Sequence, residues 1–177
     1  MIILRAKSLR KSLKGDQMLD YKIVEQAGFY AIGKAITVST KEDENLDHIP
    51  RFWDECSRDG TLEKLCADFH REEMLGVCTD FDHQSGRFTY MIAVRGGEAY
   101  VGQDYLVRQI PANTWAVFTS TGPMPDAIQA VWRHIFQEWL PSSGYEHADA
   151  PDLEVYPPGD PNSVNYRCEV WIPIIKK

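Results

Sequence analysis

One stretch near the carboxyl terminus is the most informative part of the chain, Arg167-Cys168-Glu169-Val170-Trp171-Ile172-Pro173-Ile174. Its composition predicts a β-strand, in which successive side chains project to opposite faces. Glu169 and Trp171 then share one face, and the apolar residues that alternate with them share the other. A carboxylate is costly to keep charged in apolar surroundings, and an indole ring attracts cations through its π-face. We therefore predict that Glu169 and Trp171 line a pocket for an organic cation.

A simpler interpretation of Glu169 is an ion pair with Arg167, two positions along the same face of the strand. An exposed pair of this kind contributes about 0–1 kcal/mol to stability and has no functional meaning. Both interpretations of the carboxylate stay open at this point.

The strand has a counterpart earlier in the chain, Arg87-Phe88-Thr89-Tyr90-Met91-Ile92-Ala93-Val94, in which an arginine again comes first and an isoleucine again stands sixth. Upstream of the two strands, residues 26–32 match residues 111–117, and both segments continue from a turn-like residue into an apolar run. Internal similarity of this kind predicts one structural unit that occurs twice.

Each half contains a helical pattern in which apolar side chains recur with the spacing i, i+3, i+4, i+7. The first helix is predicted to start near Asp47 and to stop at Asp59-Gly60, and the second to start at Pro125-Asp126 and to stop between Pro141 and Gly144. Packing in the core is the simpler explanation for the aromatic residues on these stripes. The stripes consist of Ile49, Phe52, Trp53 and Cys56, and of Ile128, Val131, Trp132, Ile135, Phe136 and Trp139.

Each half also has a middle strand, at residues 74–81 and 153–156, followed by a hairpin turn at Gly86 or at Asp160-Pro161-Asn162. Residues 41–46 and 145–150 are predicted to be polar loops. The order in each half is therefore β-α-β-β. The predicted fold class is α+β: duplicated β-α-β-β units form one antiparallel-rich sheet with two helices on one face and a central cleft, a place that ligands favour.

The overall composition excludes several classes of protein. The chain has 177 residues, of which 44% are hydrophobic and 25% charged, as in globular proteins. A net charge of −7 argues against a nucleic-acid-binding surface. No apolar run approaches the roughly 20 residues that a membrane span needs. We therefore expect a cytoplasmic protein that does not itself bind nucleic acid or membrane.

The spacing of cysteine and histidine argues against a metal centre. The four cysteines show no CxxC spacing and lie in apolar segments, which predicts buried, reduced thiols. The five histidines lack the HxxxH and HExxH spacings of zinc sites. A phosphate-binding loop is missing from the sequence as well. We predict neither a metal nor another cofactor.

Several short motifs occur in a set order between residues 20 and 175, and together they resemble the GyrI-like, or AraC-type effector-binding, family of small-molecule-binding domains. The resemblance implies a duplicated β-α-β-β fold, which agrees with the internal repeat. The motifs are Tyr21-Lys22-Ile23-Val24-Glu25, Ile49-Pro50-Arg51-Phe52-Trp53, Phe88-Thr89-Tyr90, Ile110-Pro111-Ala112, Trp115-Ala116-Val117-Phe118, Trp139-Leu140-Pro141-Ser142-Ser143-Gly144-Tyr145, Leu153-Glu154-Val155-Tyr156 and Glu169-Val170-Trp171-Ile172-Pro173-Ile174.

The resemblance also implies which residues contact a ligand. Glu169 matches the family's ligand-contacting glutamate on the last strand. Tyr90 joins the predicted binding residues if its hydroxyl reaches the cleft. The residues that match aromatic positions of the family pocket are Trp171, Phe118, Tyr145 and Trp53.

The predicted domain organisation has two parts. Residues 1–19 form a basic, linker-like segment, and residues 20–177 form the effector-binding domain, with halves at about 20–97 and 105–175. The stretch from Ser12 to Asp16 resembles the linker that joins AraC-type DNA-binding domains to this module. The chain is then either the sensor part of a longer regulator or a stand-alone relative.

Three functions are compatible with the resemblance. The leading one is the binding of bulky aromatic or cationic small molecules, for drug or toxin sensing or sequestration, with Glu169 as counter-charge. The first alternative is a hydrolase that opens electrophilic cyclopropane-bearing toxins, with Glu169 as the general base. The second alternative is a protein-binding module similar to gyrase inhibitors. The same residues serve the first two functions, so the sequence does not decide whether the chain is an enzyme.

Overall fold

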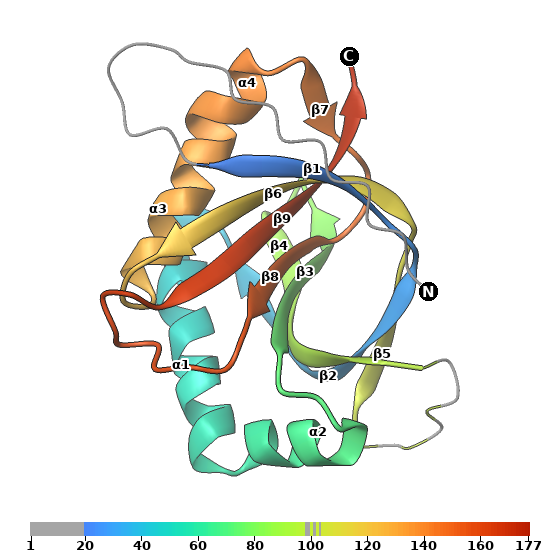
Figure 1. Ribbon diagram of the computed structural model, residues 1–177, viewed down its shortest axis with the longest axis vertical. Helices are drawn as coiled ribbons and strands as arrows, with labels where there is room; N and C mark the ends of the chain where they lie inside the picture. The colour runs from blue at the N-terminus through green and yellow to red at the C-terminus, as the bar shows by residue number, and fades with distance from the viewer. Residues whose placement is uncertain (1–19, 98–99, 101, 103) are drawn as a thin grey trace. The chain divides into compact units, whose positions relative to one another are not determined.

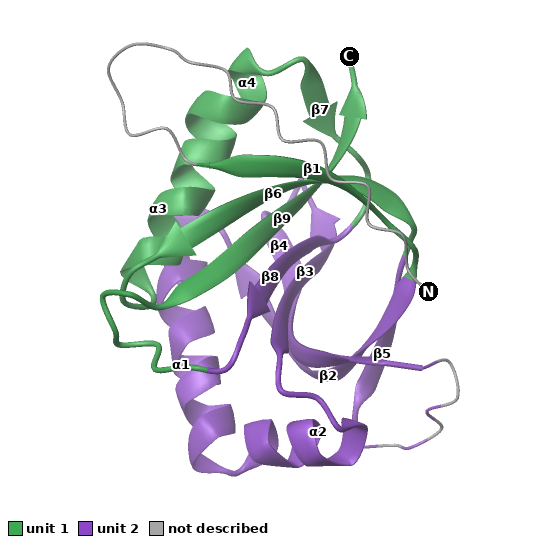
Figure 2. Ribbon diagram, viewed as in Figure 1, with its two compact units in different colours: residues 1–28, 111–150, 159–177 green, residues 29–110, 151–158 purple. Residues whose placement is uncertain are grey.

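The computed structural model describes residues 20–97, 100, 102 and 104–177 (Figure 1). These residues group into two compact units, each with its own strands and helices (Figure 2). Unit 1 contains residues 20–28, 111–150 and 159–177, and unit 2 contains residues 29–110 and 151–158. The predicted basic segment 1–19 lies outside the described residues.

Unit 1 is built on an antiparallel sheet in which β6 lies between β1 and β9, and the short strand β7 pairs with the end of β9. A helical segment of three parts packs on β6 through α3. Its elements are β1 (Tyr21–Gln26), β6 (Asn113–Thr121), α3 (Asp126–His134), the π-helical turn η2 (Ile135–Trp139), α4 (Leu140–Ser142), β7 (Tyr145–His147) and β9 (Arg167–Lys176).

Unit 2 is built on a second run of antiparallel strands in the order β8-β3-β4-β2-β5. Helix α1 packs on β2 and α2 packs on β4. Its elements are β2 (Phe29–Ser39), the 3₁₀ turn η1 (Lys41–Asp43), α1 (Glu44–Arg58), α2 (Thr61–Phe69), β3 (Met74–Asp82), β4 (Arg87–Gly96), β5 (Leu106–Ile110) and β8 (Asp152–Tyr156).

The fold class α+β with antiparallel strands is confirmed. The β-α-β-β order of each half is present as β2-α1-β3-β4 and as β6-α3-β8-β9. The two units differ from the two sequence halves, because β1 pairs with β6 of the second half and β8 pairs with β3 of the first. The predicted cleft between the halves stays a prediction.

The two predicted helices are confirmed, with differences at their ends. The first begins at Glu44 rather than near Asp47, and it stops at Arg58, directly before the predicted Asp59-Gly60. Glu44 and Asp47 both lie in its first turn, where carboxylates interact favourably with the helix dipole. In the second helix the wider π-helical turn changes the angle between successive side chains, which leaves Phe136 45% exposed instead of in the core.

Two predicted loops contain regular structure. Residues 41–46 form η1 and the start of α1, and residues 145–150 include the short strand β7. In addition, α2 was not predicted, although its apolar residues Leu62, Leu65, Cys66 and Phe69 follow the helical spacing. The hairpin turn at Gly86 was predicted correctly, since it lies between β3 and β4, which pair with each other. Residues 160–162, the second predicted turn, lie in the connection from β8 to β9.

The core of unit 2 lies between its strands and its two helices. Its buried members come from β2, β3, β4, α1 and α2 and include Tyr105 directly before β5, and Trp53 and Tyr156 pack against it as partly exposed side chains. The prediction of buried thiols holds for three of the four cysteines, whereas Cys66 is partly exposed.

Candidate functional site

A carboxylate lies in the core of unit 2, on the central part of β8. Glu154 is 5% exposed, and Asp152, which begins the same strand, is 2% exposed. It lies opposite Gly76 on β3, and β4 runs along the other side of β3. Burial of an ionised carboxylate costs several kcal/mol in proteins unless other groups stabilise it, so the groups around Glu154 define what this position can do.

Two tyrosine hydroxyls stabilise the Glu154 carboxylate, and both donate to the same oxygen. The Tyr90 hydroxyl lies 2.6 Å from Oε2, and the Tyr156 hydroxyl lies 3.0 Å from it. Hydrogen bonds to a carboxylate favour its charged form. Both donors are phenol hydroxyls, so these two bonds bring aromatic rings to the carboxylate without adding a formal charge.

The indole of Trp53, on α1, completes the cluster. Its Nε1–H donates to the Tyr90 oxygen over 2.9 Å, and its ring meets the Tyr156 ring edge-to-face with centroids 4.9 Å apart. The donors therefore form a chain from Trp53 through Tyr90 to Glu154. We call Trp53, Tyr90, Glu154 and Tyr156 the Glu154 cluster.

Gly76 leaves the space that the cluster occupies. A Cβ atom at this position would lie 2.3 Å from Oε2 of Glu154 and 2.4 Å from the hydroxyl oxygen of Tyr90. No side chain fits at such distances. A glycine in the interior of a strand often marks a place where another group approaches the backbone closely, and here that group is the hydrogen-bonded Tyr90–Glu154 pair.

The protonation of the cluster follows from its burial. Burial, and then the neighbouring charge of Glu154, raise the pKa of Tyr90 well above its ordinary value of 10.0. The Tyr90 hydroxyl is therefore a hydrogen-bond donor throughout the physiological pH range. The same two causes, burial first, raise the pKa of the Cys78 thiol, which keeps this buried cysteine neutral and unreactive.

The predicted carboxylate Glu169 lies in unit 1, on β9, in a different setting. Its Oε1 accepts a hydrogen bond from Lys22 Nζ at 2.8 Å, and its Oε2 accepts one from Trp171 Nε1 at 2.9 Å. The contact with Trp171 confirms that these two side chains share a face of the strand. The ion-pair partner is Lys22 rather than Arg167, and the Glu169 side chain is 28% exposed.

The predicted aromatic residues divide between the units. Trp53 and Tyr90 belong to the Glu154 cluster in unit 2. In unit 1, Phe118 packs edge-to-face on Trp139 with centroids 4.9 Å apart, and Trp139 stacks on Tyr145 with centroids 6.1 Å apart. Within unit 1, Phe118 and Tyr145 meet around Trp139, whereas Glu169 and Trp171 meet each other.

Glu154 was missed as a site residue, although a signal for it was present. It shares a face of its strand with Tyr156 two positions along, which is the pattern that singled out Glu169 and Trp171, and a second carboxylate, Asp152, lies on that face two positions before it. A second signal was the glycine in the middle of the predicted strand 74–81. Neither signal reveals which carboxylate is buried, because that depends on which strands become neighbours.

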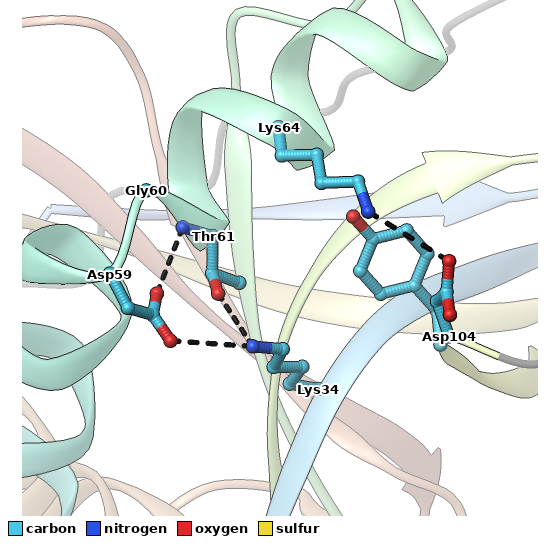
Figure 3. A pocket seen from close by; sticks show the side chains of 7 residues that line it. Lys34, Asp59, Gly60, Thr61, Lys64 and Asp104 are labelled. Carbon is cyan, nitrogen blue, oxygen red and sulfur yellow. Dashed lines mark hydrogen bonds and ion pairs between the residues drawn. The ribbon is translucent and has the colours of Figure 1, made fainter.

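An open hollow of about 290 Å³ lies elsewhere in unit 2, at the start of α2 (Figure 3). Its two lysines are engaged: Lys34 Nζ lies 3.4 Å from Asp59 Oδ2, and Lys64 Nζ lies 3.8 Å from Asp104 Oδ2. Ligand pockets for organic molecules are mostly apolar, and this lining is mostly charged. The lining residues are Lys34, Asp59, Gly60, Thr61, Lys64, Asp104 and Tyr105.

The described residues contain neither a metal-binding group of side chains nor a helix that could span a membrane. Within residues 20–97, 100, 102 and 104–177, no three His, Cys, Asp or Glu side chains are grouped so that they could hold a metal ion. In the same part of the chain, no helix combines the length and the apolar character needed to cross a membrane.

Comparison with known proteins identifies the family. Residues 22–174 match the family model of Cass2, described as integron-associated effector binding protein, and the chain belongs to this family. It is also 29% identical over 163 residues to the transcriptional regulator BrlR of Pseudomonas aeruginosa. That match covers 86% of this chain and 54% of BrlR, so the chain spans about half the length of this relative.

Two solved structures have a similar fold. A putative bacterial transcription regulation protein from Staphylococcus aureus MU50 is 26% identical, with a TM-score of 0.71 over 89% of this chain and 99% of that one. The structure of SAV2435 bound to tetraphenylphosphonium is 25% identical, with a TM-score of 0.77 over 89% of this chain and 94% of that one. With the family match, these relatives identify the chain as a small-molecule-binding domain of the effector-binding type.

Proposed function

We propose that this chain binds lipophilic organic cations at the Glu154 cluster. The observation that carries the proposal is the buried carboxylate of Glu154 among the aromatic rings of Tyr90, Tyr156 and Trp53. A cation near a carboxylate of low solvent exposure gains Coulomb energy that water screens at the surface. The rings of Tyr90 and Tyr156 add cation–π attraction of about 0.5–2 kcal/mol for each favourable contact.

The tetraphenylphosphonium bound to SAV2435 supports this choice of ligand class. The ligand carries one delocalised positive charge surrounded by four phenyl groups, and it has no hydrogen-bond donor. A site that offers a negative charge and aromatic surface matches such a molecule better than it matches a small, strongly hydrated cation. Specificity would be broad, because stacking and charge attraction tolerate many shapes.

The proposal is tested by titration calorimetry with tetraphenylphosphonium. At an effective dielectric constant of 20, a charge about 6 Å from the carboxylate gains about 2–3 kcal/mol. We therefore expect Glu154→Gln to weaken binding by roughly 30- to 150-fold. The neutral analogue triphenylphosphine oxide should bind the wild-type protein and the variant with similar affinity, since it carries no net charge.

Glu169→Gln is the matched control, because it removes a carboxylate that already has Lys22 as a partner. We expect a change of less than about threefold, which is the size of an exposed ion-pair effect. Equal affinity of wild-type protein and Glu154→Gln would contradict the proposal. A large loss in Glu169→Gln alone would instead support the prediction that Glu169 and Trp171 bind the ligand. For Phe118 and Tyr145, ligand binding stays a prediction.

As a role in the cell, we propose that ligand binding to this domain controls a transcription regulator. The similarity to BrlR supports this role, with a DNA-binding part supplied by a longer parent protein. A cytoplasmic location belongs to the same proposal. The hydrolase and gyrase-inhibitor alternatives stay predictions from the family resemblance. The regulatory role is tested by fusing the domain to a DNA-binding module and measuring whether tetraphenylphosphonium changes promoter activity.

A further inference from the structure

Trp53 occupies the outer side of the Glu154 cluster. Tyr90 and Glu154 are 0% and 5% exposed, whereas Trp53 is only partly buried. Its indole makes two directed contacts with the cluster, the hydrogen bond to the Tyr90 oxygen at 2.9 Å and the edge-to-face contact with Tyr156 at 4.9 Å. A flat aromatic group with one donor therefore already contacts both tyrosines that hold the carboxylate.

The contacts of Trp53 are those that a bound aromatic molecule would make. The indole edge rests on one tyrosine ring, and its only donor, Nε1–H, is used on the other tyrosine. Because Tyr90 has one hydroxyl hydrogen, which it donates to Glu154, its oxygen accepts the bond from Trp53. When the indole leaves, the Tyr90–Glu154 bond can remain, so the carboxylate keeps its position.

We propose that Trp53 is an internal competitor for the Glu154 site and thereby sets which ligands bind. A ligand reaches the carboxylate only after it displaces the indole from Tyr90 and Tyr156. Molecules with several aromatic rings and a positive charge replace the lost ring contacts and add charge attraction, whereas single-ring neutral molecules do not. This inference rests on the proposed binding of cations at Glu154, and it names the residue that gives the site its selectivity.

The variant Trp53→Phe shows whether the ligand displaces the Trp53 indole or binds while the indole keeps its position as a fixed wall of the site. Phenylalanine keeps an aromatic ring but lacks the donor to Tyr90, so less has to be broken before the ligand enters. A hydrogen bond of this kind corresponds to about a two- to tenfold change in an equilibrium constant. We expect Trp53→Phe to bind tetraphenylphosphonium about two- to tenfold more tightly than the wild-type protein, as measured by calorimetry.

Trp132→Phe is the matched control, since Trp132 is a helical tryptophan of unit 1 that stacks on Phe136. Its affinity for tetraphenylphosphonium should equal that of the wild-type protein. A second measurement needs no destabilising variant: the exchange of the Trp53 indole N–H with solvent, followed by NMR. We expect this N–H to be protected in the free protein and to lose its protection when tetraphenylphosphonium saturates the site.

Two results would overturn the inference while leaving the proposed function intact. One is unchanged or weaker binding by Trp53→Phe in a protein whose Glu154→Gln variant has lost affinity. The other is a Trp53 N–H that stays protected at saturation, which would make the indole a fixed wall of the site. If Glu154→Gln binds as tightly as the wild-type protein, the proposed function fails and this inference fails with it.

Discussion

The closest packing in the Glu154 cluster is at Gly76, which leads to a quantitative prediction for Gly76→Ala. The added methyl group would overlap Oε2 of Glu154 and the hydroxyl oxygen of Tyr90. Both are ends of side chains, but they cannot swing away into solvent, because Tyr90 is 0% and Glu154 5% exposed. The variant therefore either accepts the overlap or breaks the hydrogen bond between them.

The free-energy cost of the overlap and that of the broken hydrogen bond each fall in a known range. Overpacking in a well-packed core costs about 1–3 kcal/mol, and a hydrogen bond to a charged group contributes about 1.5–3 kcal/mol. We expect Gly76→Ala to lower the free energy of unfolding by about 2–3 kcal/mol in urea denaturation. The affinity for tetraphenylphosphonium should fall as well, since the carboxylate and its donor can no longer keep their present positions.

The control for this prediction is Gly144→Ala, because a methyl group there meets no atom within 4 Å. Its free energy of unfolding should change by less than about 0.5 kcal/mol, as at most surface positions. In a double-mutant cycle, Tyr90→Phe should reduce the cost of Gly76→Ala, since one of the two overlapping oxygens is then absent. A loss below 0.5 kcal/mol for Gly76→Ala with unchanged ligand affinity would refute this account of the cluster.

Three further predictions concern titration, reactivity and packing. Because the pKa of Tyr90 is raised in the folded protein, the unfolded chain loses this proton at a lower pH. The free energy of unfolding should therefore fall as the pH rises above about 10, and it should fall less steeply in Tyr90→Phe. The same pH dependence in wild-type protein and Tyr90→Phe would contradict the burial of the hydroxyl. In native protein treated with iodoacetamide, mass spectrometry should find partly exposed Cys66 alkylated before buried Cys78, although burial raises the pKa of both thiols. Ser120→Ala should raise the free energy of unfolding by about 1 kcal/mol in urea denaturation, because the fully buried Ser120 hydroxyl has no hydrogen-bond partner among the described residues; a loss of stability would indicate a partner for this hydroxyl.

The elements of the fold follow from local patterns, which is why most of them could be predicted. The stripes that contain Trp53 and Ile128 have a helical period, and the middle strands at residues 74–81 and 153–156 are short apolar runs between turn residues. Both patterns are formed by residues that lie close to one another along the chain. The errors lie where the signal is short: β7 has three residues, and α2 was overlooked although its spacing was visible.

The sequence by itself determined the fold class, most of the helices and strands, and the presence of carboxylates beside apolar residues in the strands, because these depend on neighbours along the chain. Only the tertiary structure decided between those carboxylates. Glu169 meets Lys22, which lies 147 positions away, while Glu154 meets Tyr90 in the space that Gly76 leaves open. The charge state of a carboxylate and the groups that it can bind depend on neighbours within a few ångströms. Strand pairing brings those neighbours together from distant parts of the chain.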